Sequence, residues 1–178
     1  MDTGLLSLGL AEVVVWPSLR VGQIKSHVYE DKRTDLKATE RILDAGRDLS
    51  RVIREFWPPN VIAIGVEGVS IPRKAAPQHV LKIGAGWGVL MAIAEANNVP
   101  IYQRFPASVK KFIAGSASAS KEAVQRAVEE KHGLDFQNFT KGQRSHVADA
   151  VATGLCVAAQ EKSIDMAIRM FDRQGETK

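Results

Sequence analysis

"QRSHVADAVATGLCVAAQ", residues 143–160, predicts a helix that is buried over most of its surface, because alanine, valine and leucine dominate it. One side is an apolar stripe at helical spacing, formed by Val147, Val151, Leu155 and Ala158. Asp149 nevertheless lies inside this run, with His146 one turn earlier. A carboxylate in such surroundings costs several kcal/mol unless its charge is compensated. We therefore expect Asp149 to belong to a site that supplies the compensation.

The composition is typical of a globular chain. It has 178 residues, of which 45% are hydrophobic, and this length suits a single domain, 1–178, with a sizeable core. No apolar stretch approaches the ~20 residues that span a bilayer, and no secretory signal is recognisable at the start. A single cysteine, Cys156, excludes an internal disulfide and is expected in the core. These features favour the reducing cytoplasm and no association with membranes.

Basic residues are concentrated in one part of the chain, although the net charge is only +4. Five cations and one acid, Glu122, lie between residues 104 and 126; the cations are Arg104, Lys110, Lys111, Lys121 and Arg126. The segment "KGQRSH", 141–146, adds two more before the unusual helix. Local positive charge beside a buried acid is expected where a polyanion must reach a metal site. A solvated basic face explains the same residues equally well.

The apolar pattern predicts alternating strands and helices. Strands are expected at 8–16, 23–30, 60–68 and 100–105, and helices at 34–56, 78–97, 107–114, 120–132 and 145–170. The continuous apolar run at 60–68, "NVIAIGVEG", is typical of a strand buried on both faces. The predicted class is therefore α/β, a sheet with helices on both faces.

Three acids are notable for their positions. Asp2 begins a DxG turn, Glu67 ends the most apolar strand, and Asp149 lies in the last helix. Each alone has an ordinary explanation: a terminus, a polar strand end, or the wet side of a helix. If they converge, divalent cations resolve their mutual repulsion, and Mg²⁺ prefers such oxygen ligands, with Mn²⁺ as a substitute. Two ions can hold both the attacking water and the leaving oxygen of a phosphodiester.

His146 lies three residues before Asp149 and hence on the same helical face. It can ligate a metal or act in proton transfer; a purely structural histidine is the alternative.

The ordered set of motifs closely resembles one family. A DxG turn precedes a strand, and an apolar strand ends in Glu; then come "LKIGAGWGVLMAIAEANNVPIYQRFPASVKKFIAG", "SASKEAVQRAV" and "HVADAVATGL". This order and spacing resemble the RuvC family of Holliday-junction resolvases over about residues 2–160. The resemblance implies an RNase H-like fold with a mixed central sheet, and a metal-dependent endonuclease, acting as a homodimer, that cuts four-way or other branched DNA.

Residue roles follow from the same resemblance. Asp2, Glu67, His146 and Asp149 match the four acidic or metal-binding positions of the family. Lys110 and Lys121 match lysines that the family uses near the cleaved strand, and Lys111 and Arg104 of the basic stretch are further candidates for DNA contact. The dimer interface is expected on the helix at 78–97, around Trp87, Leu90, Met91 and Ile93.

The sequence also departs from the family pattern. Only Met1 precedes Asp2, where relatives carry the residues of a central strand. Ser70 replaces an aromatic residue that the family uses against a base, and "GAGWG", 84–88, replaces a stretch that usually contains Arg; Trp87 is a candidate to take over stacking on DNA. These departures suggest an outlying member of the family. A viral source is one interpretation, in which case the protein would act in the cytoplasm of the host.

Three other readings remain open. The actin and sugar-kinase superfamily shares the DxG turn but needs two domains, about twice this length. RuvC-like nucleases that act on RNA precursors share the fold, although the lysine-bearing segment "SVKKFIAGSASASKEAVQ" favours the resolvases. A branched-DNA-binding module with weak or no catalytic activity is the third. Metal-dependent cleavage assays distinguish all of them.

Overall fold

The computed structural model describes residues 7–16, 20–30, 38–58, 60–68, 77–164 and 166. The elements are β1 (Ser7–Trp16), β2 (Arg20–Glu30), α1 (Ala38–Phe56), β3 (Ile64–Glu67), α2 (Pro77–Ala96), β4 (Ile101–Arg104), α3 (Pro106–Ala114), α4 (Lys121–His132) and α5 (Lys141–Gln160). Each predicted strand and helix is therefore present. The strand expected over 60–68 is shorter, because pairing with β4 begins only at Ile64.

The strands form two pairs. β1 and β2 are antiparallel, with a register shift between Val13 and Val15. β3 and β4 are parallel and pair from Ile64 opposite Ile101 to Glu67 opposite Arg104; the long crossover that a parallel pair requires contains α2. Among the described residues these are two two-stranded sheets, where a single mixed sheet was expected.

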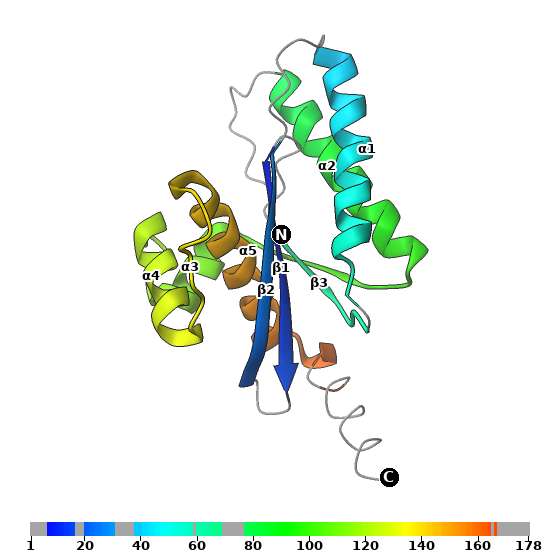
Figure 1. Ribbon diagram of the computed structural model, residues 1–178. Helices are drawn as coiled ribbons and strands as arrows, with labels where there is room; N and C mark the ends of the chain where they lie inside the picture. Colours follow the sequence, from blue (N-terminus) through cyan, green and yellow to red (C-terminus); the bar gives the residue numbers. More distant parts are fainter. Residues whose placement is uncertain are drawn as a thin grey trace.

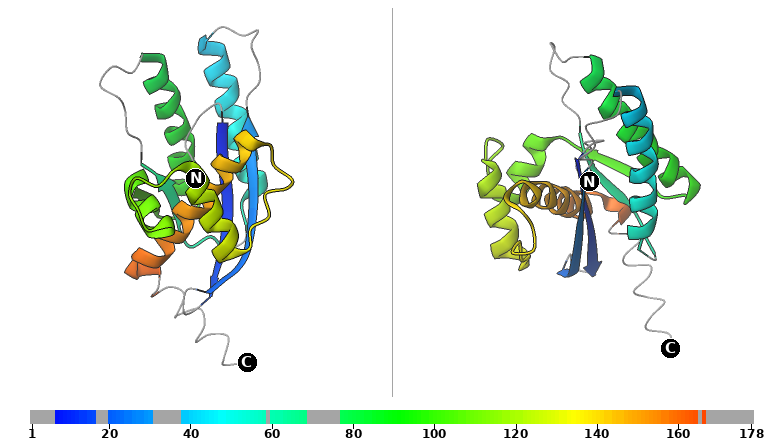
Figure 2. Two further views of the ribbon diagram at one scale, coloured as in Figure 1. Left: turned by 90° about the vertical axis from the view of Figure 1, so that its left-hand side faces the viewer. Right: turned by 45° about the horizontal axis from the view of Figure 1, so that its top comes forward.

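Helices cover the strands from both sides (Figures 1 and 2). α1 and α2 lie together on one side, and α5, with α3 and α4, lies on the other. Leu10 of β1 and Val66 of β3 are both fully buried in one apolar cluster with residues of α1 and α2. A second cluster joins α3, α4 and α5. The predicted helical layers on both faces are thus confirmed.

α5 differs at both ends from the predicted 145–170. It begins earlier because Thr140 and Gln143 form a capping box: the Thr140 hydroxyl accepts from the Gln143 N–H (3.4 Å), and the Gln143 Oε1 accepts from the Thr140 N–H (3.0 Å). It ends at Gln160, since Glu161 has an extended backbone (φ −95°, ψ 108°). The predicted boundaries were wrong. In the part of the chain that is described, no helix is both long and apolar enough to cross a membrane.

Candidate functional site

Glu67 lies at the carboxyl end of β3, where it is half-buried and stands opposite Arg104 in the strand register with β4. Gly68 follows, and its N–H donates to the Arg104 carbonyl (2.6 Å). A Cβ at Gly68 would lie 3.0 Å from the Gln103 Nε2 and 3.1 Å from the Phe105 Cδ1. The absence of a side chain at Gly68 therefore allows the end of β3 to approach the junction between β4 and α3. Carboxyl ends of parallel strands are a common place for ligand and active sites in α/β proteins.

α5 packs closely against both strand pairs, at positions where glycines leave no side chain between the helix and a strand. A Cβ at Gly9 of β1 would overlap the backbone carbonyl group of His146. Further along, a Cβ at Gly154 would lie 3.2 Å from the Val13 Cγ2, and one at Gly65 of β3 would lie 3.1 Å from the Val157 Cγ2. α5 is therefore held against β1 and β3 together, and these contacts fix the position of the helix that carries His146 and Asp149.

Asp149 is half-buried in the middle of α5. Its sequence neighbours Ala148 and Ala150 are buried, and Val151 is fully buried, as the apolar pattern predicted. The Asp149 carbonyl accepts a hydrogen bond from the buried Thr153 hydroxyl (2.8 Å), a local bond within the helix. Asp149 thus belongs to a helix that is largely surrounded by protein.

The proposed metal ligands are only partly described. Glu67, His146 and Asp149 are within the described residues, whereas Asp2 lies outside them, as does Ser70. Among the described residues, no group of three His, Cys, Asp or Glu side chains could hold a metal ion. Glu67, His146 and Asp149 therefore do not form such a group by themselves. In donor chemistry, two half-buried carboxylates and an imidazole suit a hard divalent cation.

α3, which carries two lysines, begins next to the end of β3 that bears Glu67. This is because β4 pairs with β3 and leads directly into α3. Val109 and Ile113 are buried and anchor α3 to the rest of the protein, while Lys111 is exposed and Lys110 half-buried. Within the described part of the chain, neither lysine forms an ion pair. Lys121 is exposed at the first position of α4, whose N-cap Ser120 accepts from the Ala123 N–H (3.2 Å).

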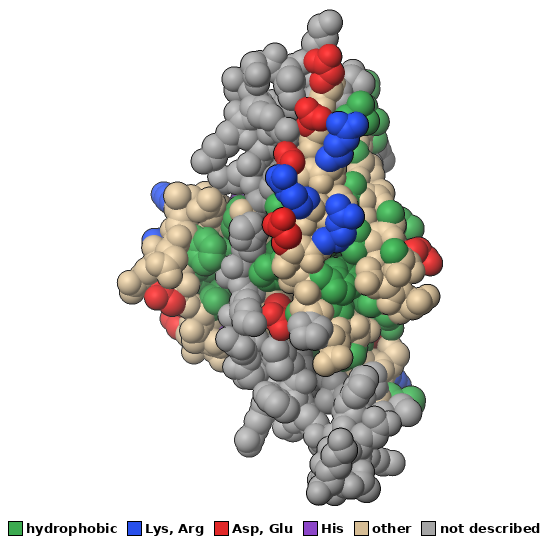
Figure 3. All heavy atoms as spheres, turned by 45° about the vertical axis from the view of Figure 1, so that its right-hand side comes forward, with side chains coloured by type: hydrophobic (Ala, Val, Ile, Leu, Met, Phe, Trp, Pro, Cys, Tyr) green, Lys and Arg blue, Asp and Glu red, His purple; other side chains and the backbone are tan. Residues whose placement is uncertain are grey.

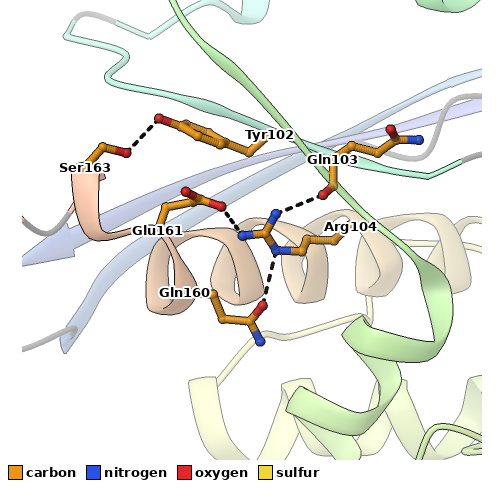
Figure 4. A network of polar contacts seen from close by, with 6 residues as sticks. All are labelled: Tyr102, Gln103, Arg104, Gln160, Glu161 and Ser163. Atoms are coloured by element: carbon orange, nitrogen blue, oxygen red, sulfur yellow. Dashed lines mark hydrogen bonds and ion pairs between the residues drawn. The ribbon is translucent and has the colours of Figure 1, made fainter.

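Arg104 has a different environment from these lysines (Figure 4). Its guanidinium donates to the Gln160 Oε1 (3.2 Å) and the Gln103 carbonyl (2.9 Å), and it forms an ion pair with Glu161. The Arg104 side chain is only 18% exposed. Arg104, expected as a DNA contact, is therefore engaged in joining β4 to the C-terminal end of α5. The Tyr102 hydroxyl contacts the Ser163 Oγ (2.7 Å) in the same region.

Trp87, a candidate for stacking on DNA, is half-buried against the cluster of α1 and α2. Its Nε1 is buried and has no hydrogen-bond partner among the described residues. Leu90 and Ile93, expected in a dimer interface, are buried within the chain. Phe105, which the sequence pattern did not mark as a candidate, is 61% exposed beside the end of β3. The available signal was an aromatic residue placed directly before the proline that begins α3.

Cys156 takes no part in the site. It is fully buried in the cluster of α3, α4 and α5, as expected. Burial raises the pKa of the Cys156 thiol, which keeps it protonated and unreactive at neutral pH.

Solved structures with the same arrangement define the fold class. The chain resembles "T. thermophilus RuvC in complex with Holliday junction substrate", with a TM-score of 0.69 and 28% identity, over 94% of this chain and 93% of that one. It also resembles "Thermus thermophilus RuvC structure", with a TM-score of 0.64 and 28% identity, over 88% and 90% of the two chains. The protein thus has the RNase H-like α/β fold of these nucleases.

Sequence relatives then define the family. Residues 1–157 match the family described as "Crossover junction endodeoxyribonuclease RuvC". A protein of that name from Natranaerobius thermophilus is 36% identical over 69% of this chain and 71% of its own length. Another from Chlamydia abortus is 28% identical over 89% and 91% of the two chains. The chain belongs to the RuvC family of crossover junction endodeoxyribonucleases.

Proposed function

We propose that this chain is a structure-selective endonuclease that resolves four-way (Holliday) or other branched DNA by hydrolysing phosphodiester bonds. The observation that carries the proposal is the likeness, over 94% of the chain, to a RuvC structure in complex with a Holliday junction substrate. The family match over residues 1–157 also contains β3, β4 and most of α5, the elements that bear Glu67 and Asp149.

The nuclease is proposed to use two Mg²⁺ ions, for which Mn²⁺ can substitute. Asp2, Glu67, His146 and Asp149 are the proposed ligands, since carboxylate oxygens are the preferred donors for these cations. When bound, such ions lower the pKa of the attacking water and neutralise charge on the phosphodiester. Glu67 and Asp149 orient the scissile group from β3 and α5. His146, one turn before Asp149, moves or holds a proton at its imidazole during hydrolysis.

The lysines supply the proposed DNA contacts. Lys110 and Lys111 on α3 and Lys121 at the start of α4 are proposed to bind backbone phosphates near the cut. Their charges favour phosphate binding, and two of them, Lys111 and Lys121, are exposed. Arg104 is left out of this set because its guanidinium is occupied by Glu161 and Gln160.

A homodimer is proposed because a four-way junction has near two-fold symmetry and needs two symmetry-related cuts. α2 offers a suitable stripe at helical spacing, formed by Leu81, Gly84, Gly88 and Met91. Leu81 and Met91 are 56% and 53% exposed, and the space where a Cβ would stand on each glycine is open. This stripe keeps Met91 of the interface expected from the sequence, whereas Leu90 and Ile93 are buried on another side of the helix. Met91→Glu should yield a monomer in sedimentation velocity.

The decisive experiment compares active-site variants on a synthetic four-way junction in Mg²⁺. Glu67→Gln and Asp149→Asn should abolish cleavage while junction binding stays within a few-fold of wild type. Glu95→Gln, at an exposed acid on α2, is the matched control and should cut normally. A site variant that retains near-normal cleavage would remove that residue from the mechanism.

The wild-type protein distinguishes the alternatives in the same assay. Junction binding without any cleavage would indicate a binding module, and preferred cleavage of an RNA precursor would indicate the RNA-directed function. We further propose that residues 1–178 work as one domain in the cytoplasm. The contact of α5 with both strand pairs supports the first point, because one helix thereby joins the two pairs.

A further inference from the structure

Phe105 occupies its position at a cost to stability. It is the N-cap residue of α3, with an extended backbone (φ −73°, ψ 145°), and it makes no side-chain capping hydrogen bond. Ser, Thr, Asp and Asn are preferred at this position because their side chains bond to a free helix N–H, which a phenyl ring cannot do. The ring is also 61% exposed, so it gains little from burial. Neither capping nor core packing explains an aromatic residue here.

The ring has a defined position beside Gly68, the residue that follows the candidate catalytic Glu67. A Cβ at Gly68 would lie 3.1 Å from the Phe105 Cδ1, so one edge of the ring faces the residue that follows Glu67. Pro106 fixes the backbone at the first position of α3, and the Ser108 N–H donates to the Phe105 carbonyl (2.9 Å). The ring is therefore supported on one side and open on the other.

The charges nearby suit a nucleic acid. α3, which Phe105 begins, carries Lys110 and Lys111 and has no acidic residue in its first turn. Exposed aromatic rings combined with basic residues are the usual means by which proteins hold unpaired nucleotides: cations bind the phosphates and the ring stacks on a base. A hydrophobic protein partner would be favoured by a broad apolar patch, whereas the polar residues Gln103 and Arg104 precede this ring, and Ser108, Lys110 and Lys111 follow it within two helical turns.

We propose that Phe105 stacks on a nucleobase adjacent to the cleaved phosphodiester, one that is unpaired or unstacked at the DNA branch. This inference rests on the proposed nuclease function and adds a specificity residue to it. Stacking on Phe105 would favour branch positions where a base can leave the helix. It would also fix that base relative to Glu67 and so align the neighbouring phosphate.

The test pairs a protein variant with a DNA variant. Phe105→Ser removes the ring but introduces a preferred N-cap residue, so the melting temperature should stay level or rise, by about 2–4 °C. Junctions carrying an abasic site at each position flanking the cut are compared with intact junctions, and binding is measured without Mg²⁺ so that the DNA stays whole. With wild-type protein, one abasic position should weaken binding about 5- to 100-fold.

Phe105→Ser should weaken binding to the intact junction by a similar factor. This variant should then bind the junction with the abasic site at that position as tightly as it binds the intact junction. This non-additivity is the signature of a direct contact. Phe105→Trp, which keeps an aromatic ring, should bind the intact junction as well as wild type does. In Phe105→Ser the salt dependence of binding should stay unchanged, because the phosphate contacts remain. Leu43→Ala is the matched control: Leu43 is 60% exposed on α1, and its loss should combine additively with every abasic site.

Two failures are distinguishable. If wild-type protein neither binds nor cuts the junction, the proposed function fails. If wild-type protein cuts normally, and Phe105→Ser cuts equally well with additive abasic effects, the function stands and the role of Phe105 is overturned.

Discussion

α1 and α3 both carry basic side chains, but in the part of the chain that is described, acidic partners are found for Arg47 and Arg51 of α1 and not for the lysines of α3. Arg47 pairs with Asp44 (3.2 Å) and Arg51 with Asp48 (3.0 Å), each one turn apart on the exposed face of α1. Figure 3 shows acidic and basic side chains interspersed over this part of the surface. On α3, by contrast, Lys110 and Lys111 form no ion pair among the described residues.

The ends of the helices differ in the same way. α1 has Glu40 in its first turn and Arg54 in its last, which matches the helix dipole. α3 has no acid in its first turn, and α4 begins with Lys121, although Glu122 follows it. The charges of α1 are thus arranged to stabilise their own helix. Those of α3 and of the start of α4 are left available to an external anion, as binding to DNA requires.

Charge reversal gives the largest expected contrast. Lys110→Glu with Lys111→Glu removes two phosphate contacts and adds repulsion, so junction affinity near 0.1 M salt should fall by at least about 50-fold. Arg47→Glu with Arg51→Glu on α1 is the matched control and should change affinity by less than about three-fold, since surface charges far from the contact act only through a screened field. Fluorescence anisotropy with a labelled junction measures both. If the two double variants lose junction affinity equally, the lysines of α3 have no special role in DNA binding compared with the arginines of α1.

Lys121→Gln should have a smaller effect on DNA binding, and it should also change the stability of the protein. Loss of one phosphate contact should reduce the slope of log affinity against log salt concentration by about 0.9. Removal of a cation from a helix N-terminus should at the same time stabilise α4 by about 0.3–1 kcal/mol. Salt titrations and urea denaturation measure the two quantities. If neither changes, Lys121 is an ordinary solvated lysine.

The smallest effect is expected for the ion pairs of α1. Asp44→Asn and Asp48→Asn should each reduce the free energy of unfolding by no more than about 0.5 kcal/mol, because the paired arginines are largely exposed and such pairs one turn apart are weak in water. The loss should disappear in 1 M salt, where screening removes the interaction in wild type as well. Junction affinity should not fall in either variant. A loss above 1 kcal/mol that persists in high salt would mean that these acids have a role beyond the exposed pairs.

Local pattern was sufficient to predict most of the fold. Apolar periodicity located all the strands and helices, and the burial of α5 around Asp149 followed from its alanines and valines. The face of α2 could not be predicted in the same way. This helix is apolar on nearly all sides, so only its packing against α1 decides that Leu90 is inside and Met91 outside.

The candidate site depended on similar signals. Glu67, His146 and Asp149 were singled out by their positions at a strand end and in a buried helix. The ion pair of Arg104 could not be predicted, because its partner, Glu161, lies 57 residues away and the pairing depends on where α5 ends. Phe105 was missed because exposure is a tertiary property, and a phenylalanine in an alternating sequence is ordinarily assigned to the core.

The backbone contacts of α5 bear on which genetic changes the protein tolerates. His146, Gly154 and Val157 meet β1 and β3 at three points along one helix face. Inserting or deleting one residue between Asp149 and Gly154 would turn the first half of the helix by about 100° relative to the second. The strand contacts at His146 and those at Gly154 and Val157 could then no longer form together. In natural and engineered variants, α5 should therefore accept many substitutions on its outer side but almost no change in length.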